Sequence, residues 1–149
     1  MVGENGLYAV AIQLPHVFLP GSSPEENADV LRTLVEALVA IDRIYLRARR
    51  DRQLPTLYQA GVRYARTEDW LPTPVLYWQR YGDCKSLAAA RIAELRESGK
   101  VAKPAFRFLP RPDGVMYHIL VQTSAGGFED PSKICGMPED EWSQFGQMH

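Results

Sequence analysis

The 149-residue sequence has few of the residues that form disulfides or bind metals. It contains two cysteines, Cys84 and Cys135, and three histidines, with neither Cys-x-x-Cys nor paired-histidine spacing. Two widely spaced cysteines do not make a disulfide framework, which favours a reducing compartment. A zinc site built from Cys84, Cys135 and His118 would lack the closely spaced ligands typical of zinc proteins. We therefore expect no disulfide and no metal site.

A bias toward one sign of charge is also missing. Lys and Arg number 17 and Asp and Glu 18, which gives a net charge of −1. This balance argues against a nucleic-acid partner held by general basic charge. No apolar run approaches the ~18 residues of a membrane span, and residues 1–5 lack the basic start of a signal peptide. We expect no membrane contact and a cytoplasmic location, or a virion-associated one if the chain is encoded by a phage.

Internal repeats, low-complexity segments and linkers are absent, so residues 1–149 are expected to form a single domain. Apolar run 7–14 predicts a strand. A capping box at Ser23 and Glu26 then starts a helix to about Arg49. Its predicted core stripe recurs at steps of three and four residues, namely Val30, Leu31, Leu34, Leu38, Ile41, Tyr45 and Ala48.

The second half of the chain alternates between helix and strand signals. A short strand is predicted at 61–67, a helical turn at 75–80, a helix at 84–98 that ends at Gly99, and strands at 104–109 and 115–123. The Asp-Gly pair between the two strands favours a hairpin. Another short strand begins at Phe128, and 131–149 is expected to be irregular. Helices followed by an antiparallel sheet indicate the α+β class.

Cys84 is the first candidate for chemistry. Gly82 and Asp83 break the chain just before a strong helix former, so Cys84 is expected on the first turn of that helix, with Asp83 as its N-cap. Free N–H groups and the positive end of the helix dipole favour a thiolate there, and the thiolate is the nucleophilic form. The competing interpretation is a small buried apolar residue.

A base and an orienting group follow in the chain. His118 is central in the best predicted strand, whereas His16 falls in an early loop and His149 is the last residue. Asp130 comes just after the next turn, so a tight hairpin would bring it to the strand beside His118 and let it fix the imidazole tautomer. Alternatively, His118 is a structural histidine and Asp130 only caps the turn before Pro131.

These residues resemble a known family. The segments that carry the resemblance are Gly-Asp-Cys-Lys-Ser-Leu-Ala at 82–88, Tyr-His-Ile-Leu-Val at 117–121, Glu-Asp-Pro-Ser at 129–132 and the lead-in Trp-Leu-Pro-Thr-Pro at 70–74. Together they resemble the transglutaminase-like superfamily of papain-type cysteine enzymes, and within it the small bacterial and phage cysteine peptidases. The resemblance covers residues 57–137.

The resemblance implies a papain/transglutaminase-like core, with the cysteine helix packed on an antiparallel sheet. It implies a catalytic triad of Cys84, His118 and Asp130, acyl transfer through a thioester, and no metal or organic cofactor. The many-stranded scaffold and calcium sites of full transglutaminases do not fit in 149 residues, so hydrolysis of a peptide or isopeptide bond is favoured over amine crosslinking. The expected partner is a protein or peptide substrate.

Other residues complete the expected site. The Cys84 N–H is one natural donor to an oxyanion, and the Gln79 side chain or the Trp78 indole is a candidate for the second. Tyr81 and Tyr117 are candidates for lining the substrate cleft, and Tyr81 is equally suited to the core. The arginine-rich stretch 47–52 fits a solvated helix end or, alternatively, a surface that docks an acidic partner.

Two further functions remain open. The first is a cell-wall amidase or peptidase like the NlpC/P60 group, which also places a cysteine on a helix ahead of a strand histidine. Its usual Asp-Cys-Ser-Gly string is replaced here by Asp-Cys-Lys-Ser, and its third polar residue, commonly a histidine, by Asp130. The second is a non-catalytic binding or assembly module in a phage particle, with phage structural proteins as partners.

Overall fold

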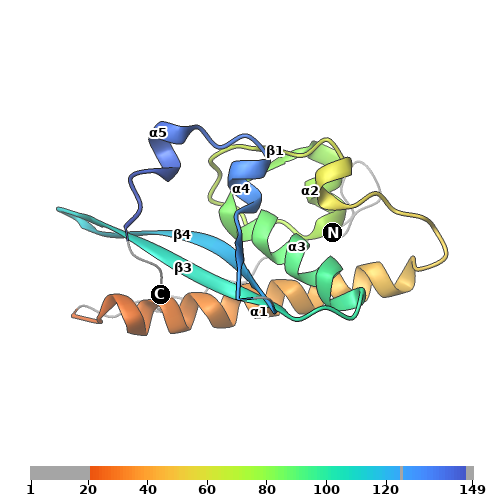
Figure 1. Ribbon diagram of the computed structural model, residues 1–149, viewed down its shortest axis with the longest axis horizontal. Coiled ribbons are helices and arrows are strands. Elements are labelled where there is room, and N and C mark those ends of the chain that lie inside the picture. The colour runs from red at the N-terminus through yellow and green to blue at the C-terminus, as the bar shows by residue number, and fades with distance from the viewer. Residues whose placement is uncertain (1–20, 125, 147–149) are drawn as a thin grey trace, which may run out of the picture.

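A computed structural model describes residues 21–124 and 126–146 of the chain. The two longest helices pack on one face of a three-stranded antiparallel sheet, with strand order β3-β4-β5 (Figure 1). The strands are β3 (Ala102–Arg111), β4 (Gly114–Thr123) and β5 (Phe128–Glu129). This arrangement confirms the α+β class. The expected strand at 7–14, His16 and His149 lie outside the described residues.

Helix α1 (Pro24–Ala48) begins as expected at a capping box. The Glu26 N–H donates to Ser23 Oγ at 3.1 Å, and the Ser23 N–H donates to the Glu26 carboxylate at 3.2 Å. The predicted core stripe is partly wrong, because Ile41 is 53% exposed. The buried face is rotated toward Ala28, Val35, Leu38, Val39 and Asp42. Since both faces of this helix carry apolar residues, spacing alone did not select the side that packs on the sheet.

Helix α3 (Cys84–Glu97) packs against both α1 and the sheet, and it is the cysteine helix expected from the sequence. Its central alanines Ala88, Ala89, Ala90 and Ala93 are at most 2% exposed, so small side chains let it approach both neighbours closely. Gly99 ends the helix with φ of +79°, and the Lys100 N–H donates back to the Leu95 carbonyl at 3.0 Å.

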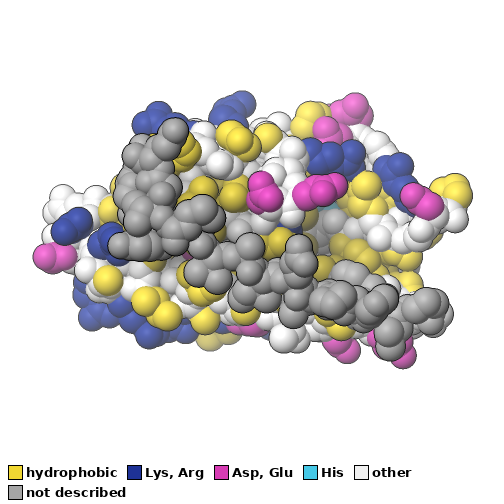
Figure 2. Space-filling view, turned by 180° about the vertical axis from the view of Figure 1, so that it is seen from behind, with side chains coloured by type: hydrophobic (Ala, Val, Ile, Leu, Met, Phe, Trp, Pro, Cys, Tyr) yellow, Lys and Arg dark blue, Asp and Glu magenta, His cyan; other side chains and the backbone are white. Residues whose placement is uncertain are grey.

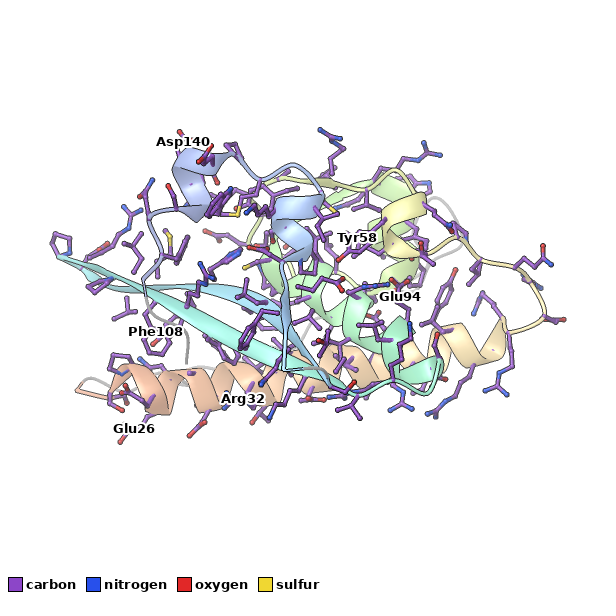
Figure 3. All side chains as sticks on the ribbon, viewed as in Figure 1. Glu26, Arg32, Tyr58, Glu94, Phe108 and Asp140 are labelled. Atoms are coloured by element: carbon purple, nitrogen blue, oxygen red, sulfur yellow. The ribbon has the colours of Figure 1, made fainter. Side chains whose placement is uncertain are left out.

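The two faces of the β3–β4 hairpin contact different parts of the domain. Tyr117 is paired with Phe108, and this face packs on α1 and α3 with Phe106, Ile119 and Val121. Figure 3 shows Phe108 between β3 and α1. His118 is paired with Arg107, so both side chains leave the opposite face of the sheet. The hairpin therefore packs one row of side chains on α1 and α3 and places His118, which is also buried, on the other face.

The segment before α3 forms a second, small sheet. Strands β1 (Arg63–Tyr64) and β2 (Tyr81–Gly82) pair in parallel, with α2 (Thr73–Gln79) between them in the chain. The strand predicted at 61–67 is therefore only two residues long, and β2 was not predicted. Gly82 is required here because a Cβ atom would lie 2.6 Å from Leu76 Cδ1, and Leu76 is fully buried.

The chain after β5 is not irregular as expected. It forms α4 (Pro131–Ile134) and α5 (Glu139–Trp142), each only four residues long. Such short helices have no room for an apolar repeat, so periodicity could not reveal them. Their starts are marked instead by prolines, with Pro131 as the first residue of α4 and Pro138 as the N-cap of α5.

The surface seen from behind carries basic side chains over the C-terminal end of α1 (Figure 2). Arg43 and Arg47 in this region both bind Glu97, at 3.0 and 2.6 Å. The Arg49 guanidinium lies 4.1 Å from the centre of the Tyr45 ring. Much of this positive charge is therefore paired within the domain. In the part of the chain described, no helix is long and apolar enough to cross a membrane.

Asp42 is a fully buried carboxyl group in α1. Its Oδ1 accepts the backbone N–H of Thr73 at 2.7 Å, which ties α1 to the first turn of α2. Burial raises the pKa of Asp42 to about 7, against the opposing effect of the hydrogen bonds from Thr73. The folded protein therefore holds a proton on Asp42 that the unfolded chain releases near pH 4.

Asp42→Asn should remove this dependence of stability on pH. Because the folded-state pKa is raised, the Asp42 contribution is complete below pH 4 and is lost as the pH rises to about 7. An asparagine can still accept the Thr73 N–H. We expect the variant to gain several degrees of Tm relative to wild type between pH 4 and pH 8, measured by thermal unfolding. The exposed control Asp51→Asn should show no such trend. A Tm difference between Asp42→Asn and wild type that stays constant from pH 4 to pH 8 would contradict the raised pKa of Asp42.

Candidate active site

Cys84 is the first residue of α3, and β2 leads directly into it. The Leu87 N–H closes the first helical turn on the Asp83 carbonyl at 3.0 Å, which leaves the Cys84 N–H outside the helical ladder. Asp83 is the N-cap by backbone position, but its side chain makes no capping hydrogen bond and pairs with Lys85 instead. Lys85 also donates to the Thr67 carbonyl at 2.9 Å, so it fixes the loop beside Cys84.

His118 lies on β4 and is 2% exposed. Its Nε2 lies 2.9 Å from Asp130 Oδ2, which leaves Nδ1 as the ring nitrogen available to Cys84. The Phe145 ring packs against the imidazole with a centroid distance of 5.1 Å. The structure therefore brings Cys84, His118 and Asp130 together from α3, β4 and the end of β5.

Asp130 performs both of the roles that its sequence position allowed. While Oδ2 contacts His118, Oδ1 accepts the Lys133 N–H at 3.2 Å and caps α4. Val121 is paired with Glu129, and continuing this register places Asp130 opposite Leu120, on the same face as His118. One carboxylate thus joins the histidine strand to the following helix.

A half-buried ionic network holds the neighbouring Glu129. The Arg91 Nε of α3 lies 2.5 Å from Glu129 Oε1, and Arg91 also binds Glu94 at 2.8 Å. The Tyr58 hydroxyl, in the 3-10 turn Leu57–Gln59, donates to Glu129 as well. Figure 3 shows Tyr58 and Glu94 close together beside α3. Since Glu129 precedes Asp130, these contacts fix the strand end that carries the carboxylate.

The electrostatic surroundings of His118 favour its charged form. Burial lowers the pKa of the imidazole, but the hydrogen bond with Asp130 and the interaction with Cys84 outweigh this effect and raise the pKa to about 9. The negative charges of the same two groups act in the same direction. His118 is therefore an imidazolium at neutral pH.

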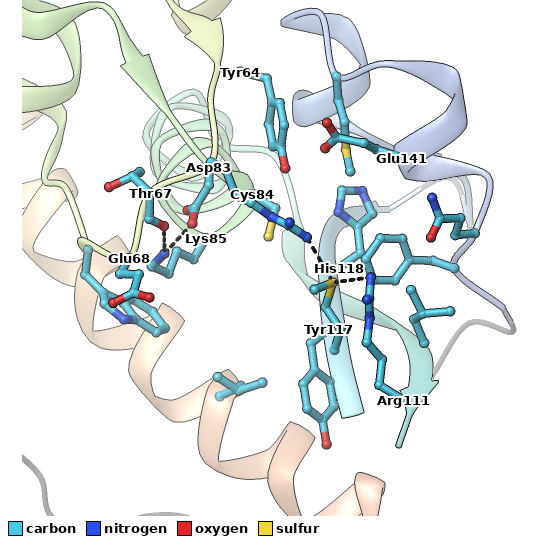
Figure 4. Close-up of a pocket in the computed structure, with 18 of the residues that line it drawn as sticks. Tyr64, Thr67, Glu68, Asp83, Cys84, Lys85, Arg111, Tyr117, His118 and Glu141 are labelled. Carbon is cyan, nitrogen blue, oxygen red and sulfur yellow. Dashed lines mark hydrogen bonds and ion pairs between the residues drawn. The ribbon is translucent and has the colours of Figure 1, made fainter. Parts of the chain in front are cut away.

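Cys84 and His118 open onto a cleft of about 930 Å³. Figure 4 shows their side chains facing the same space as Tyr64. Tyr117 also lines the cleft, as expected, and its hydroxyl donates to the Pro24 carbonyl at 3.2 Å. The volume is in the range of ligand-binding clefts. Cys84 is half-buried, so its sulfur is held in place and still faces open space.

The other expected residues lie elsewhere. Trp78 is 64% exposed, because it is two residues from buried Leu76 on α2 and so faces away from the domain. Gln79 donates its amide to the Tyr81 carbonyl at 2.9 Å. Tyr81 is 46% exposed, on the opposite side of β2 from buried Gly82. None of these three is among the described residues that line the cleft. The Cys84 N–H remains the first candidate oxyanion donor.

Tyr64 is a site residue that sequence reasoning missed. It ends β1, is paired with Gly82, and lines the cleft. Burial raises the pKa of its hydroxyl, and the negative charge of Cys84 adds to the increase, so the group stays protonated and can donate a hydrogen bond. Arg66 and Arg111 also line the cleft and were not predicted. The pairing of β1 with β2 and the hydrogen bond from the Tyr64 N–H to the Cys135 carbonyl bring Tyr64 near Cys84, and no pattern in the sequence predicts either contact.

Cys135 is separate from this site. It is a buried free thiol at the end of α4, and its carbonyl accepts the Tyr64 N–H at 2.9 Å. Burial raises the pKa of the Cys135 thiol to about 11, against the opposing effect of Arg63. Within residues 21–124 and 126–146, no group of three or more His, Cys, Asp or Glu side chains is arranged to hold a metal ion.

Comparisons with known proteins found no match to this chain among protein-family models, curated proteins or solved structures. The resemblance to transglutaminase-like enzymes therefore rests on the motif residues alone.

Alkylation with iodoacetamide near neutral pH should discriminate the two thiols. We expect the folded protein to be modified at Cys84 about tenfold faster or more than at Cys135, because Cys135 is buried and fully protonated. His118→Ala should slow the reaction at Cys84 and leave Cys135 unchanged. Peptide mapping by mass spectrometry measures both rates, and unfolded protein provides the reference in which both thiols react. Equal rates at the two thiols of the folded protein, or an unchanged rate at Cys84 in His118→Ala, would contradict an interaction between Cys84 and His118.

Proposed function

We propose that this protein is a thiol-dependent hydrolase that cleaves peptide or isopeptide bonds through Cys84, His118 and Asp130. The observation that carries the proposal is that His118 contacts Asp130 at 2.9 Å while His118 and Cys84 line the same cleft. Cys84 also raises the pKa of His118, so the two side chains interact. A nucleophile, a base within hydrogen-bond reach and a group that orients the base are the parts that covalent acyl transfer needs.

In the first half of the reaction, the Cys84 thiolate attacks the carbonyl carbon of the scissile bond. A carbon–sulfur bond forms, and the carbonyl electron pair moves to oxygen. The Cys84 N–H and the Tyr64 hydroxyl are the donors proposed to stabilise this oxyanion. The His118 imidazolium then gives its proton to the leaving nitrogen, the carbon–nitrogen bond breaks, and the acyl group remains on Cys84 as a thioester.

In the second half, water replaces the amine. Neutral His118 takes a proton from the water as its oxygen attacks the thioester carbon. The carbon–sulfur bond breaks, the acid product leaves, and Cys84 returns as a thiolate beside protonated His118. Asp130 holds the imidazole in one orientation through both halves and stabilises its positive charge. An amine in place of the water would give transamidation, so the same site is competent for either outcome.

The geometry bears on the alternatives raised by the sequence. A triad that had lost its activity would allow Cys84 to be buried apart from His118, whereas here Cys84 is half-buried and both side chains line one cleft. This favours an enzyme over a purely structural module. A cell-wall amidase would use the same three side chains, so the choice between protein and peptidoglycan substrates depends on the cleft and on a direct assay.

Peptide-library profiling tests the proposal. Incubation of a proteome-derived peptide library with wild-type protein should generate new termini that mass spectrometry can detect, and rapid acid quenching should trap an acyl adduct on Cys84. We expect Cys84→Ala to abolish both signals, because no other described residue of the cleft is a comparable nucleophile.

Cys135→Ala is the matched control, since it removes the other thiol and should leave the cleavage intact. A parallel incubation with purified sacculi addresses the amidase alternative, and release of muropeptides without peptide cleavage would support that class instead. Peptide cleavage that persists in Cys84→Ala would contradict the proposed nucleophile.

The pH profile of the activity tests the role of Asp130. Because His118 must carry a proton for the leaving amine, kcat/KM should fall as the pH rises through about 9. Asp130→Asn removes the carboxylate that raises the pKa of His118, and asparagine still suits the N-cap of α4. The alkaline limb should therefore move to lower pH by roughly 1–3 units. The exposed control Asp113→Asn should not move it, and an unmoved limb in Asp130→Asn would contradict the assigned role.

A further inference from the structure

The cleft contains two arginines with no carboxylate partner among the described residues. Arg66 comes from the loop after β1, and Arg111 from the end of β3. Arg66 Nη2 lies 3.3 Å from Met116 Sδ, and Arg111 Nη2 lies 3.9 Å from the same sulfur atom (Figure 4). A thioether carries no charge, so two guanidinium groups converge on one point of the cleft without neutralisation.

This arrangement differs from that of several other cations in the domain. Arg43, Arg91 and Arg96 each bind a glutamate, and Lys85 inside the cleft is paired with Asp83. Glu68 and Glu141 also line the cleft, but neither forms an ion pair with Arg66 or Arg111. Figure 4 shows Glu68 beside Lys85 and Glu141 on the α5 side. The positive charge is thus concentrated at the hairpin end.

The position of the pair relative to the reacting groups follows from β4. Met116 and His118 lie two residues apart on the same face of the strand, which separates them by about 7 Å. An extended peptide advances about 3.4 Å per residue. A substrate group that reached the arginines would therefore belong to a residue about two positions from the scissile bond.

We propose that Arg66 and Arg111 form a subsite for a carboxylate of the substrate, located about two residues from the bond that Cys84 attacks. This inference rests on the proposed function and adds the substrate class, an acidic peptide. Guanidinium groups bind carboxylates through paired, charge-assisted hydrogen bonds, which suits recognition of a planar anion. The carboxylate belongs either to an Asp or Glu side chain or to the C-terminus of the peptide.

Two maleimide reagents of nearly the same shape test the subsite without requiring turnover. Both alkylate a thiol; 3-maleimidopropionic acid carries a carboxylate several bonds from the reacting carbon, and its primary amide is neutral. We expect Cys84 of the wild-type protein to favour the acid over the amide, and Arg66→Gln/Arg111→Gln to reduce this rate ratio about three- to tenfold. High salt should shrink the wild-type preference, because both arginines are exposed.

The matched control is Arg50→Gln/Arg52→Gln, which removes two positive charges from a surface that does not line the cleft. It should leave the ratio at the wild-type value. An unchanged ratio in Arg66→Gln/Arg111→Gln, or an equal loss in the control, would overturn the subsite and leave the proposed hydrolase intact. Failure of Cys84 to react with either reagent would overturn the proposed function, and the subsite with it.

Peptide cleavage distinguishes the two sources of the carboxylate. Enrichment of Asp or Glu about two residues from the cleaved bond, lost in Arg66→Gln/Arg111→Gln, indicates side-chain recognition. Cleavage confined to the ends of peptides and abolished by C-terminal amidation indicates recognition of the terminal carboxylate. Cleavage that depends on Cys84 but shows neither preference would overturn the subsite alone.

Discussion

The site depends on the hydrogen bond between His118 Nε2 and Asp130 Oδ2. At 2.9 Å it fixes the ring of an imidazole that is 2% exposed, and it provides the negative charge that such a buried cation requires. The same carboxylate caps α4. Loss of this bond would therefore leave a buried histidine without its counter-charge and disturb the segment that follows β5.

Much of the surrounding fold keeps that bond in place. The alanine-rich α3 packs closely on both α1 and the sheet, which sets the distance from Cys84 to β4. Gly82 permits β2 to pass against Leu76 directly before the cysteine. The Arg91–Glu129 pair ties α3 to the residue that precedes Asp130. Polar contacts and close packing thus converge on three side chains that are distant in sequence.

The elements that carry these three side chains were predictable because their signals are local. The Gly-Asp-Cys break predicted the start of α3, and the strand signal at 115–123 after the Asp-Gly turn predicted β4 with His118 near its centre. The rest of the cleft depends on tertiary packing. Tyr64 and Arg66 reach it through a sheet of two-residue strands, while Trp78 and Gln79, although near Cys84 in sequence, are turned away by α2. Proximity in the chain was therefore a poor guide to the oxyanion donors.

The most direct measurement is a titration of the His118 imidazole by nuclear magnetic resonance, with ¹⁵N-labelled histidine and the assignment made from His118→Gln. The interactions of His118 with Asp130 and Cys84 predict that His118 is an imidazolium at pH 7, with protons on both ring nitrogens, and that its pKa lies near 9. A neutral His118 at pH 7, unaffected by Cys84→Ala or Asp130→Asn, would contradict the account.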